Sequence, residues 1–283
     1  MPDEFALTSS DFNLISRILK QEAGIVLLPA KATLVYSRLA KRLRKCGVGT
    51  FHDYCALVQH DVGERAIMIE ALTTNTTSFF REPHHFEHLQ KHVLPSLVSS
   101  ARSGKRGRIW SSASSSGQEP YSIALSILQS TPDAANLDLR ILATDINATM
   151  VDRGASGIYS SEETADIPRA LASRYFMRHD EGGGRDLHVV ATDEIKRLIS
   201  FRVLNLFDEW PMKGMFDVVF CRNVMIYFDA ATQSELWERI SRKVAMGGIL
   251  YIGHSERVTG PAAEAFRQVG TTTYAKVKEA HLP

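Results

Sequence analysis

The chain has 283 residues and is 44% hydrophobic, which is enough to bury the core of one large domain with a small companion. Its 33 lysines and arginines nearly cancel its 32 aspartates and glutamates, and this balance argues against a nucleic-acid-binding protein. Its three cysteines form no C-x-x-C pair, which argues against a disulfide framework or a zinc knuckle. Neither a signal-peptide pattern nor a run of roughly 20 apolar residues is found, so we expect a cytoplasmic protein that does not insert into a membrane.

Helical signals run from Thr8 to about Leu72, and we expect residues 1–72 to form a small N-terminal helical domain. Apolar residues recur at helical spacing over 12–19, which predicts a first helix. A second helix is expected to end at Gly47, and a third to open with Thr50 and Asp53 as a capping pair.

The second of these helices has an apolar stripe of Val35, Leu39 and Leu43, and we expect its positive residues to lie on the opposite side. No acidic residue occurs in the segment 31–45. A charge run of this kind is usually a solvated surface, and a partner-binding surface is the alternative. The residues expected to bind a partner in that alternative are Lys31, Arg38, Lys41 and Arg42.

Residues 73–100 are expected to form a linker and a connecting helix. A plain capped linker would explain the two phenylalanines of this segment as core residues and Pro83 as the start of the helix. That interpretation gives no role to three polar residues of the linker, Asn75, Thr77 and Arg81.

His84, His88 and His92 recur every four residues after this proline and would share one face of a helix. No carboxylate motif of the H-E-x-x-H type accompanies them, and surface histidines of a helix are common. We therefore expect no metal site.

From residue 101 to residue 283 apolar strand-like runs alternate with helical segments, which predicts an α/β domain with a mostly parallel sheet covered on both faces. The strand runs are 108–113, 139–146, 199–204, 216–223 and 248–254. The helical segments lie near 119–130, 147–155 and 230–245.

Two further segments complete this domain. The run 271–278, after a short helix expected at 262–270, could add an antiparallel edge strand. The segment 175–190 is typical of a hairpin with its turn at residues 182–184, so a small antiparallel β-subdomain is expected at about 175–195.

The residues that follow each predicted strand are unusually polar. In an open parallel sheet the ligand lies beyond the carboxyl ends of the strands, so these positions are the candidate site. They are the segment 114–119, Asp145, Asn205, Arg222 with Asn223, and the segment 254–256.

The loop after the first strand, within "RIWSSASSSGQEPYS", contains a single glycine, Gly117. A dinucleotide-binding fingerprint needs three glycines, so a nicotinamide cofactor is disfavoured. The sequence also lacks a G-x-S-x-G elbow, a P-loop and a cysteine in a cationic setting, which argues against a hydrolase or a kinase.

Asp145 has two interpretations. A carboxylate at the end of the second strand can accept hydrogen bonds from two ribose hydroxyls. The same residue could instead cap the helix that begins at Ile146. The polar residues at the other strand ends favour a ligand.

Six ordered motifs together resemble the chemotaxis receptor methyltransferases, the CheR family, over about residues 10 to 277. They are "TTNTTSFFRE", "IWSSASSSGQEPYSIAL", "ATDI", "VLNLF", "FDVVFCRNVMIYF" and "GHSE". The resemblance implies a class I methyltransferase, with a Rossmann-like, mostly parallel sheet and an antiparallel edge strand. It also implies the N-terminal all-helical domain and the small antiparallel β-subdomain.

The implied activity is that of a protein-glutamate O-methyltransferase. Such an enzyme uses S-adenosyl-L-methionine, releases S-adenosyl-L-homocysteine, and forms glutamyl methyl esters on the cytoplasmic helices of chemoreceptors. The resemblance further implies a monomer whose partner is the chemoreceptor, with no nucleic acid involved.

The resemblance assigns site residues by motif. Tyr227 is similar to the family's active-site tyrosine, where a buried core tyrosine would be the structural alternative. The implied cofactor contacts are Asn75, Thr77, Arg81, Glu119, Asp145, Asn205, Leu206, Arg222 and Asn223. The implied acceptor is acidic, which favours the basic helix within residues 31–45 as the partner-binding surface.

The first loop departs from the family pattern at Ser114, Ser116 and Gln118, where the family usually has cysteine or alanine, threonine and glutamate. Small residues stay small at the first two positions, so packing should be preserved. The role of Gln118 is open. A non-catalytic cofactor-binding docking module and a methyltransferase for another acceptor are the alternative functions.

Overall fold

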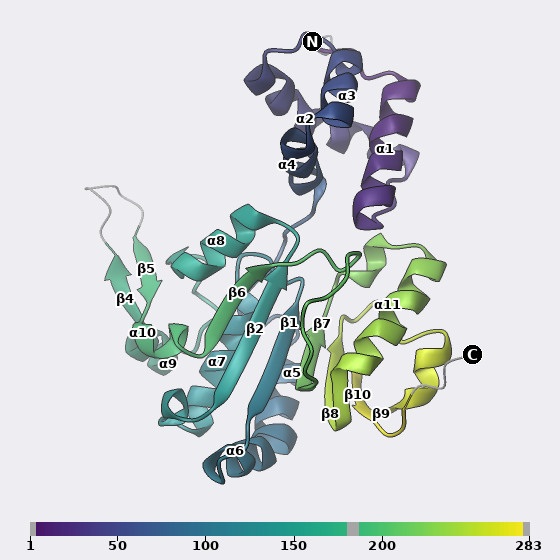
Figure 1. Ribbon diagram of the computed structural model, residues 1–283. Coiled ribbons are helices and arrows are strands. Elements are labelled where there is room, and N and C mark those ends of the chain that lie inside the picture. Colours follow the sequence, from purple (N-terminus) through teal and green to yellow (C-terminus); the bar gives the residue numbers. More distant parts are fainter. Residues whose placement is uncertain (1–3, 180–186, 280–283) are drawn as a thin grey trace. The chain divides into compact units, whose positions relative to one another are not determined.

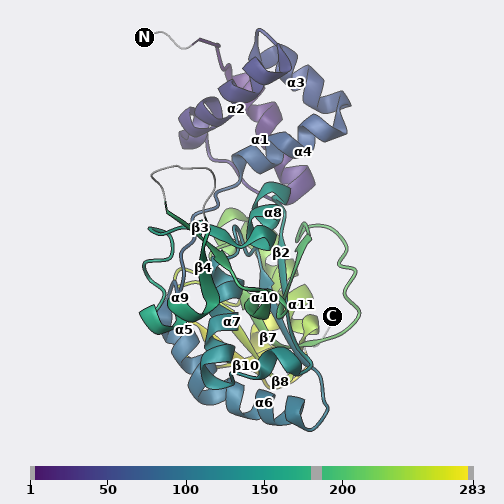
Figure 2. The same ribbon diagram turned by 90° about the vertical axis from the view of Figure 1, so that its left-hand side faces the viewer.

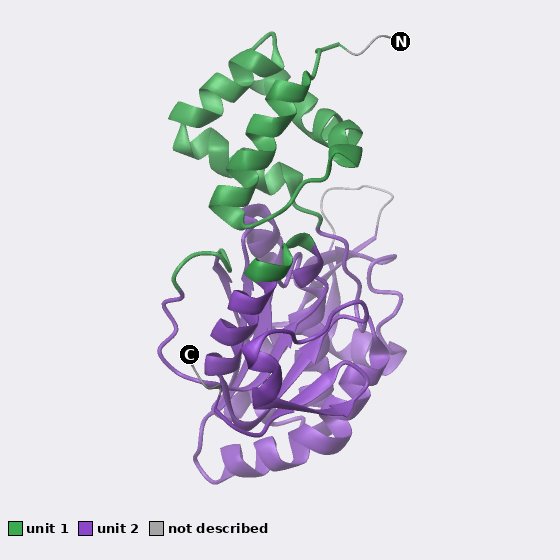
Figure 3. Ribbon diagram, turned by 90° about the vertical axis from the view of Figure 1, so that its right-hand side faces the viewer, with its two compact units in different colours: residues 1–74, 205–209, 227–232 green, residues 75–204, 210–226, 233–283 purple. Residues whose placement is uncertain are grey.

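The structure is a computed structural model, and it describes residues 4–179 and 187–279. The chain divides into two compact units (Figure 3). The first unit holds residues 1–74 together with two short later stretches, 205–209 and 227–232. The second unit holds residues 75–204, 210–226 and 233–283.

The first unit is built on four helices: α1 (Ser9–Ala23), α2 (Ala32–Cys46), α3 (Phe51–His60) and α4 (Val62–Leu72), with a 3-10 turn at Pro29–Lys31. Local capping sets their ends. Thr8 and Asp11 form a reciprocal capping box on α1, and the Thr50 side chain accepts a hydrogen bond from Asp53 N at the start of α3. The helix ends predicted at Gly47 and Thr50 are thus confirmed.

The second unit contains a seven-stranded sheet in the order β6-β2-β1-β7-β8-β10-β9 (Figure 1). Five strands are parallel and overlap the predicted runs: β1 (Gly107–Ser112), β2 (Leu139–Asp145), β6 (Ile199–Val203), β7 (Phe216–Cys221) and β8 (Val244–Ile252). β8 begins at Val244, where the predicted helix was expected to continue to residue 245. Parallel strands need crossover connections, and these contain helices except between β6 and β7, where residues 204–215 form a loop.

Alternate residues of the strands form two cores. Ile109 of β1 and Phe220 of β7 belong to the larger core, whereas Trp110 points to the other face and packs edge-on against Trp210 at 5.0 Å. Figure 1 shows α7 (Gln118–Ser130) and α6 (Leu94–Arg102) behind the sheet and α11 (Ala230–Lys243) in front of it. The sheet is covered on both faces, as predicted.

The C-terminal edge of the sheet differs from the prediction. Residues 262–270 were expected to be a short helix, but only Pro261–Ala265 form a 3-10 turn, and Phe266–Gly270 form strand β9. The run expected to be the edge strand becomes β10 (Thr273–Lys276), which pairs antiparallel with both β8 and β9. β9 is therefore the edge strand.

A small antiparallel sheet in the order β3-β5-β4 lies beyond the β6 side of the large sheet and faces the viewer in Figure 2. Its strands are β3 (Ile158–Ser160), β4 (Phe176–His179) and β5 (His188–Ala191). The predicted hairpin pairs as expected, with Met177 opposite Val190. Its turn at residues 182–184 lies outside the described residues.

The remaining helices connect these strands. They are α5 (Pro83–His88) with a π-helical turn at Leu89–Val93, α8 (Ala148–Ser156), α9 (Arg169–Tyr175) and α10 (Asp193–Lys196), and 3-10 turns at Ala134–Asn136 and Met225–Tyr227. Among the described residues, no helix is both long and apolar enough to span a bilayer.

Candidate active site

Arg222 joins two acidic side chains beyond the carboxyl ends of the parallel strands. It directly follows β7, and its side chain is 2% exposed. One guanidinium nitrogen donates to Glu119 Oε2 at 3.0 Å, and the other lies 3.3 Å from Glu82 Oε2 and donates to the Arg81 carbonyl oxygen. Glu119 lies in the first turn of α7, and Glu82 precedes α5. This arrangement is a buried charged cluster at the edge where parallel sheets bind ligands.

The two acids of the cluster differ in their pKa. Burial raises the pKa of Glu119, against the opposing effects of Arg222 and of the Ser111 hydroxyl, which donates to Glu119 Oε1 at 2.7 Å. Burial also acts on Glu82, but Arg222 and the hydrogen bonds from His254 outweigh it and hold the pKa of Glu82 at about 2. Glu82 is thus a fixed negative charge at neutral pH.

His85 lies behind this cluster and is fully buried. Its Nε2 is 2.8 Å from the Thr272 hydroxyl oxygen, and its Nδ1 is 3.5 Å from Glu82 Oε2. Burial and the nearby Arg222 charge lower the pKa of His85 to about 3, so the ring is neutral at pH 7.

Asp145 ends β2, and both oxygens of its carboxylate accept backbone hydrogen bonds. Ser115 N donates to Oδ2 at 2.7 Å, and Asn147 N donates to Oδ1 at 2.9 Å. The helix-cap interpretation of Asp145 is wrong, because the residue that caps α8 is Asn147, whose side chain accepts from Met150 N at 3.1 Å. Asp145 instead ties the first loop to the end of β2.

The serine loop after β1 has an unusual backbone. Ser115 has a positive φ of 49°, and its hydroxyl donates to the Asn75 carbonyl oxygen at 2.8 Å. Gly117 has a φ of 97°, and a Cβ there would lie 2.8 Å from the Tyr159 hydroxyl oxygen, so only glycine fits. Gln118 is buried and accepts a hydrogen bond from the Ser116 hydroxyl at 2.8 Å, which gives it a structural contact inside the loop.

Of the linker residues that the sequence singled out, Asn75 contacts this loop. Asn75 offers its carbonyl oxygen to Ser115, and Arg81 donates to the Thr76 carbonyl oxygen at 3.0 Å. Thr77 is half-buried. Phe79 packs edge-on against Tyr159 at 5.1 Å, as the core interpretation of the linker phenylalanines predicts.

Asn205, Leu206 and Tyr227 belong to the first unit together with the N-terminal helices. The Asn205 side-chain amide donates to the Glu22 carbonyl oxygen at 2.7 Å. The Tyr227 carbonyl oxygen accepts a hydrogen bond from Val26 N at 2.9 Å. Tyr227 is half-buried, so it is not the buried core tyrosine that was the structural alternative.

Fewer basic side chains of helix α2 are exposed than the sequence suggested. Arg42 is 15% exposed and forms a bidentate pair with buried Glu64, which also accepts from the Tyr54 hydroxyl at 2.8 Å. Arg38 donates to the Ala71 and Thr73 carbonyl oxygens at the end of α4. The prediction that both arginines lie opposite the apolar stripe is wrong. The cations of α2 and its preceding turn that stay exposed are Lys31, Lys41, Arg44 and Lys45, and Arg44 pairs with Glu4.

The predicted histidine stripe is also rearranged. His88 and His92 remain neighbours across the π-helical turn at Leu89–Val93, with ring centroids 4.9 Å apart. His84 instead approaches the Thr272 hydroxyl at 3.4 Å, and His88 Nδ1 lies 2.9 Å from the Tyr251 hydroxyl. Glu82, His84 and His85 can bring ligand atoms within 4.8 Å of one another. Since Glu82 is already paired with Arg222 and His85 contacts Thr272, we assign no metal to this group.

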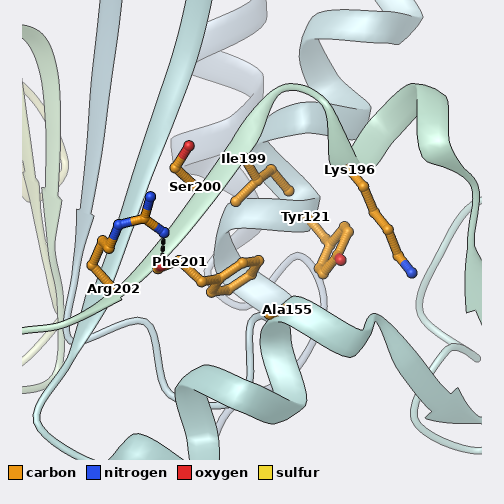
Figure 4. A pocket seen from close by; sticks show the side chains of 7 residues that line it. All are labelled: Tyr121, Ala155, Lys196, Ile199, Ser200, Phe201 and Arg202. Carbon is orange, nitrogen blue, oxygen red and sulfur yellow. Dashed lines mark hydrogen bonds between the residues drawn. The ribbon is translucent and has the colours of Figure 1, made fainter.

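A separate hollow of about 250 Å³ lies on the outer side of β6 (Figure 4). It contains none of the residues that the sequence predicted for the site. The Arg202 side chain folds over the neighbouring backbone, where its guanidinium donates to the Phe201 carbonyl oxygen at 2.6 Å. The residues around this hollow are Tyr121, Ala155, Lys196, Ile199, Ser200, Phe201 and Arg202.

The structure brings Glu82 and His85 to the site although neither was predicted for it, and it brings Glu256 from the candidate segment 254–256, where this residue had no role of its own. Glu82 and Glu256 stand inside quoted motifs, "TTNTTSFFRE" and "GHSE", and Glu256 also follows a predicted strand. That position was a signal for Glu256. His85 had no comparable signal, because its burial depends on the β9–β10 turn.

The fold and the strand-end site define a class I methyltransferase, and the comparisons with known proteins identify the family. Residues 75–275 match the family model "CheR methyltransferase, SAM binding domain", and residues 10–73 match "CheR methyltransferase, all-alpha domain". The chain therefore belongs to the CheR methyltransferase family and uses S-adenosylmethionine.

Curated relatives agree with this assignment over almost the whole chain. A "Probable chemotaxis protein methyltransferase" of Rhizobium etli is 49% identical over 91% of this chain and 96% of its own length. The "Chemotaxis protein methyltransferase 2" of Pseudomonas aeruginosa is 38% identical over 96% of this chain and 94% of its own. The "Chemotaxis protein methyltransferase" of Escherichia coli is 39% identical over 99% of this chain and 95% of its own.

The residues present fit S-adenosylmethionine. Arg222 Nε and Ser114 Oγ are buried atoms for which the described part of the chain supplies no hydrogen-bond partner, so each has capacity for a ligand. The carboxylates of Glu119 and Asp145 suit a ligand that carries an ammonium group, a sulfonium and ribose hydroxyls. The donor set thus matches the family's cofactor.

Proposed function

We propose that this chain methylates glutamate side chains on the cytoplasmic helices of chemoreceptors. The observation that carries this proposal is the buried cluster of Arg222, Glu119 and Glu82 beyond the parallel strands. This cluster supplies a positive and two negative groups where a zwitterionic cofactor needs them. The curated relatives, which are named chemotaxis protein methyltransferases, support the choice of acceptor.

The proposed cofactor contacts are divided by their chemistry. Asp145 would accept from the ribose hydroxyls, and Glu119 and Arg222 would face the ammonium and carboxylate of the methionine part. Asn75, Thr77, Arg81 and Asn223 would complete these contacts. For Asn205 and Leu206 the assignment to the adenine rests on their motif alone.

Bound S-adenosylmethionine supplies a methyl group on a positively charged sulfur, which is open to attack by a nucleophile. A glutamate acceptor with a reference pKa of about 4.3 is protonated only about once in 500 at pH 7, so it needs no general base. The chain's task is then to bind, to orient the carboxylate and to exclude water. Orientation of this kind can lower the barrier by about 7 kcal/mol or more.

Tyr227 is the proposed orienting residue for the acceptor carboxylate, since its hydroxyl can donate a hydrogen bond to a carboxylate oxygen. Val26 N and the Tyr227 carbonyl oxygen are joined by a 2.9 Å hydrogen bond, which fixes the backbone of this residue within its unit. A fixed backbone limits the positions that the hydroxyl can reach.

The proposed receptor-facing surface is the exposed basic part around α2, with Lys31, Lys41 and Lys45. A receptor helix that displays glutamates is acidic, and these lysines would speed its association. Because the acceptor helices are cytoplasmic, we place the protein in the cytoplasm. We further propose that it acts as a monomer and without nucleic acid.

The decisive experiment incubates the protein with methyl-labelled S-adenosylmethionine and receptor-rich membranes. We expect label on the receptor that is released by mild base, because a carboxyl ester is base-labile and an N-methyl group is not. Receptors in which the acceptor glutamates are replaced by alanine are the control. Base-stable label, or label that persists on the alanine receptors, would contradict the proposal.

A further inference from the structure

Glu256 holds two strand-end turns together through one buried carboxylate. The residue is 6% exposed. Its Oε1 accepts from Val224 N and Met225 N, both at 2.8 Å. Its Oε2 accepts from Asn223 N at 3.0 Å and from Gly253 N at 2.6 Å. Each oxygen thus receives two backbone hydrogen bonds, three of the four from the turn that follows β7.

The turn after β7 has the form of a backbone anion site. Asn223 has a φ of 57°, in the left-handed region that asparagine tolerates better than most residues. Consecutive N–H groups in such a turn converge on one point and attract an anion. In this protein the anion is a side chain of the same chain, Glu256.

Gly253 shows how tightly the two turns meet. A Cβ at this position would lie 2.5 Å from Asn223 Nδ2 and 2.8 Å from both Asn223 N and Glu256 Oε2. Such distances do not occur in folded proteins, so the turn after β7 would have to move to accept a side chain. The absence of a side chain at Gly253 is therefore part of the same arrangement.

We infer that Glu256 is a positioning residue for the methyl-transfer site. Its carboxylate accepts hydrogen bonds from the N–H groups of residues 223–225 and so holds the backbone of this turn in one conformation. That conformation determines how the side chains of Arg222 and Asn223 are oriented at the end of β7. This inference rests on the proposed function, because it takes Arg222 and Asn223 as cofactor contacts. Glu256 itself stays bound to backbone and does not touch the reacting atoms.

A carboxylate is the group that this position requires. It offers two acceptor oxygens and no donor, which matches four inward-pointing N–H groups. A glutamine at 256 keeps the shape but replaces one oxygen by an NH2 group, and that group must face two N–H donors. Two buried donors then lose their partner, and the turn moves to hydrate them.

The test compares Glu256→Gln with Asp217→Asn. Asp217 is a matched control, because its carboxylate accepts from Arg108 N at 2.8 Å and so also ties β7 to a neighbouring backbone, near the start of the strand. For each variant, calorimetry measures S-adenosylhomocysteine affinity, and hydrogen exchange with mass spectrometry measures protection of residues 222–226. Thermal unfolding confirms that each variant is folded.

We expect Glu256→Gln to weaken S-adenosylhomocysteine binding about tenfold or more, equal to roughly 1.4 kcal/mol, and to raise exchange in residues 222–226. Asp217→Asn should have neither effect, because the asparagine oxygen can still accept from Arg108 N and the residue lies near the start of β7. If Glu256→Gln does not fold, Gly253→Ala tests the same point, since its methyl group displaces the turn while the carboxylate remains.

Wild-type affinity in folded Glu256→Gln, or in Gly253→Ala, would overturn the inference. Equal loss of affinity in Asp217→Asn would do the same, because the effect would then be general destabilisation. A failure of the proposed function would be detected by a different measurement, the labelling of receptors. Wild-type protein that binds S-adenosylhomocysteine but leaves receptors unlabelled would refute the acceptor assignment and leave the role of Glu256 intact.

Discussion

Among single residues, Asp145 gives the most direct test of the cofactor site. Replacing it by alanine should weaken S-adenosylhomocysteine binding by about 1.5 to 3 kcal/mol, because charge-assisted hydrogen bonds to the ribose are lost. This corresponds to about tenfold to more than a hundredfold in the dissociation constant, measured by calorimetric titration.

Asp145 also holds Ser115 and Asn147 through their N–H groups, so loop disorder must be separated from lost ligand contact. Asn147→Ala is the control, because it removes the cap of α8 and leaves the carboxylate in place. It should cost about 1 kcal/mol of stability and leave affinity unchanged. A folded Asp145→Ala protein with wild-type affinity would remove Asp145 from the site.

Tyr227 should act on turnover more than on binding. Tyr227→Phe removes the hydroxyl and keeps the ring, so we expect kcat to fall by tenfold or more, at about 1.4 kcal/mol, with little change in S-adenosylhomocysteine affinity. Parallel measurement of receptor methylation rate and calorimetric affinity checks this. Equal losses in the two quantities would mean that Tyr227 only shapes the pocket, and full activity would end its assignment.

His85 should make stability depend on pH. Its pKa is lowered from the ordinary value to about 3 by burial and by Arg222, so the folded state disfavours the proton that the unfolded chain accepts. Its contribution is complete above about pH 6.5 and is lost as the pH falls toward 3, by at most about 1.4 kcal/mol per pH unit.

Urea unfolding between pH 4.5 and 7.5, the range above the ordinary pKa of Glu82, about 4.5, measures this effect together with that of His88, whose pKa burial also lowers. The free energy of unfolding of the wild type should fall with decreasing pH, and His85→Gln should reduce that slope while it keeps a partner for Thr272. An unchanged slope in His85→Gln would assign the pH dependence to another group.

At the scale of elements, helix α2 has two kinds of cation with opposite expectations. Arg42→Ala leaves Glu64 buried without its partner and should lower the free energy of unfolding by about 3 kcal/mol. Lys41→Ala changes an exposed side chain and should stay within about 0.5 kcal/mol. Urea denaturation of the two variants decides the matter, and similar losses would contradict the structure of this helix.

The different environments of Arg42 and Lys41 show which features of α2 could be predicted from sequence and which could not. Periodicity predicted α2 and its apolar stripe correctly, because the spacing of Val35, Leu39 and Leu43 is a local property. The partner of Arg42 is 22 residues away, on α4. No local pattern distinguishes an arginine that reaches such a partner from one that faces solvent.

The same distinction explains the C-terminal strands. Residues 262–270 have apolar residues at helical spacing, which predicted a helix, but Phe266–Gly270 pair with β10 and become β9. Tertiary pairing overrode a weak local preference. The parallel strands were predicted because each contains a short apolar run, although β6 is largely exposed and β8 begins at Val244, four residues before its predicted run.

The candidate site was also predictable where it depends on local sequence, and not where it depends on contacts between distant residues. Glu119, Asp145 and Arg222 follow predicted parallel strands, and the carboxyl ends of such strands share one edge. Glu82 comes from the segment before the sheet and is 140 residues from Arg222, its partner, and 141 residues from Asn223, which it also contacts. Motif resemblance pointed to that segment, but not to this pairing.

At the scale of the whole molecule, the exposed lysines around α2 should govern how the enzyme meets its receptor. Alanine at Lys31, Lys41 and Lys45 should raise the receptor KM several-fold at low salt, about 1 kcal/mol, and flatten its salt dependence. S-adenosylhomocysteine affinity should stay unchanged. Methylation kinetics at two salt concentrations check this, and kinetics equal to those of the wild type at both would show that this face is only solvated.

The composition of the first compact unit also limits how domains can be exchanged between members of the family. The family models divide the chain between residues 73 and 75, but the unit includes 205–209 and 227–232 from the later chain. Lys20 pairs with Asp229 at 2.9 Å, and Val26 N bonds the Tyr227 carbonyl oxygen. A chimera could take its first 74 residues from one relative and the remainder from another. In each of these contacts, one residue would then come from the first relative and its partner from the second. Engineers who exchange receptor specificity between relatives should therefore transplant three stretches of chain and not one.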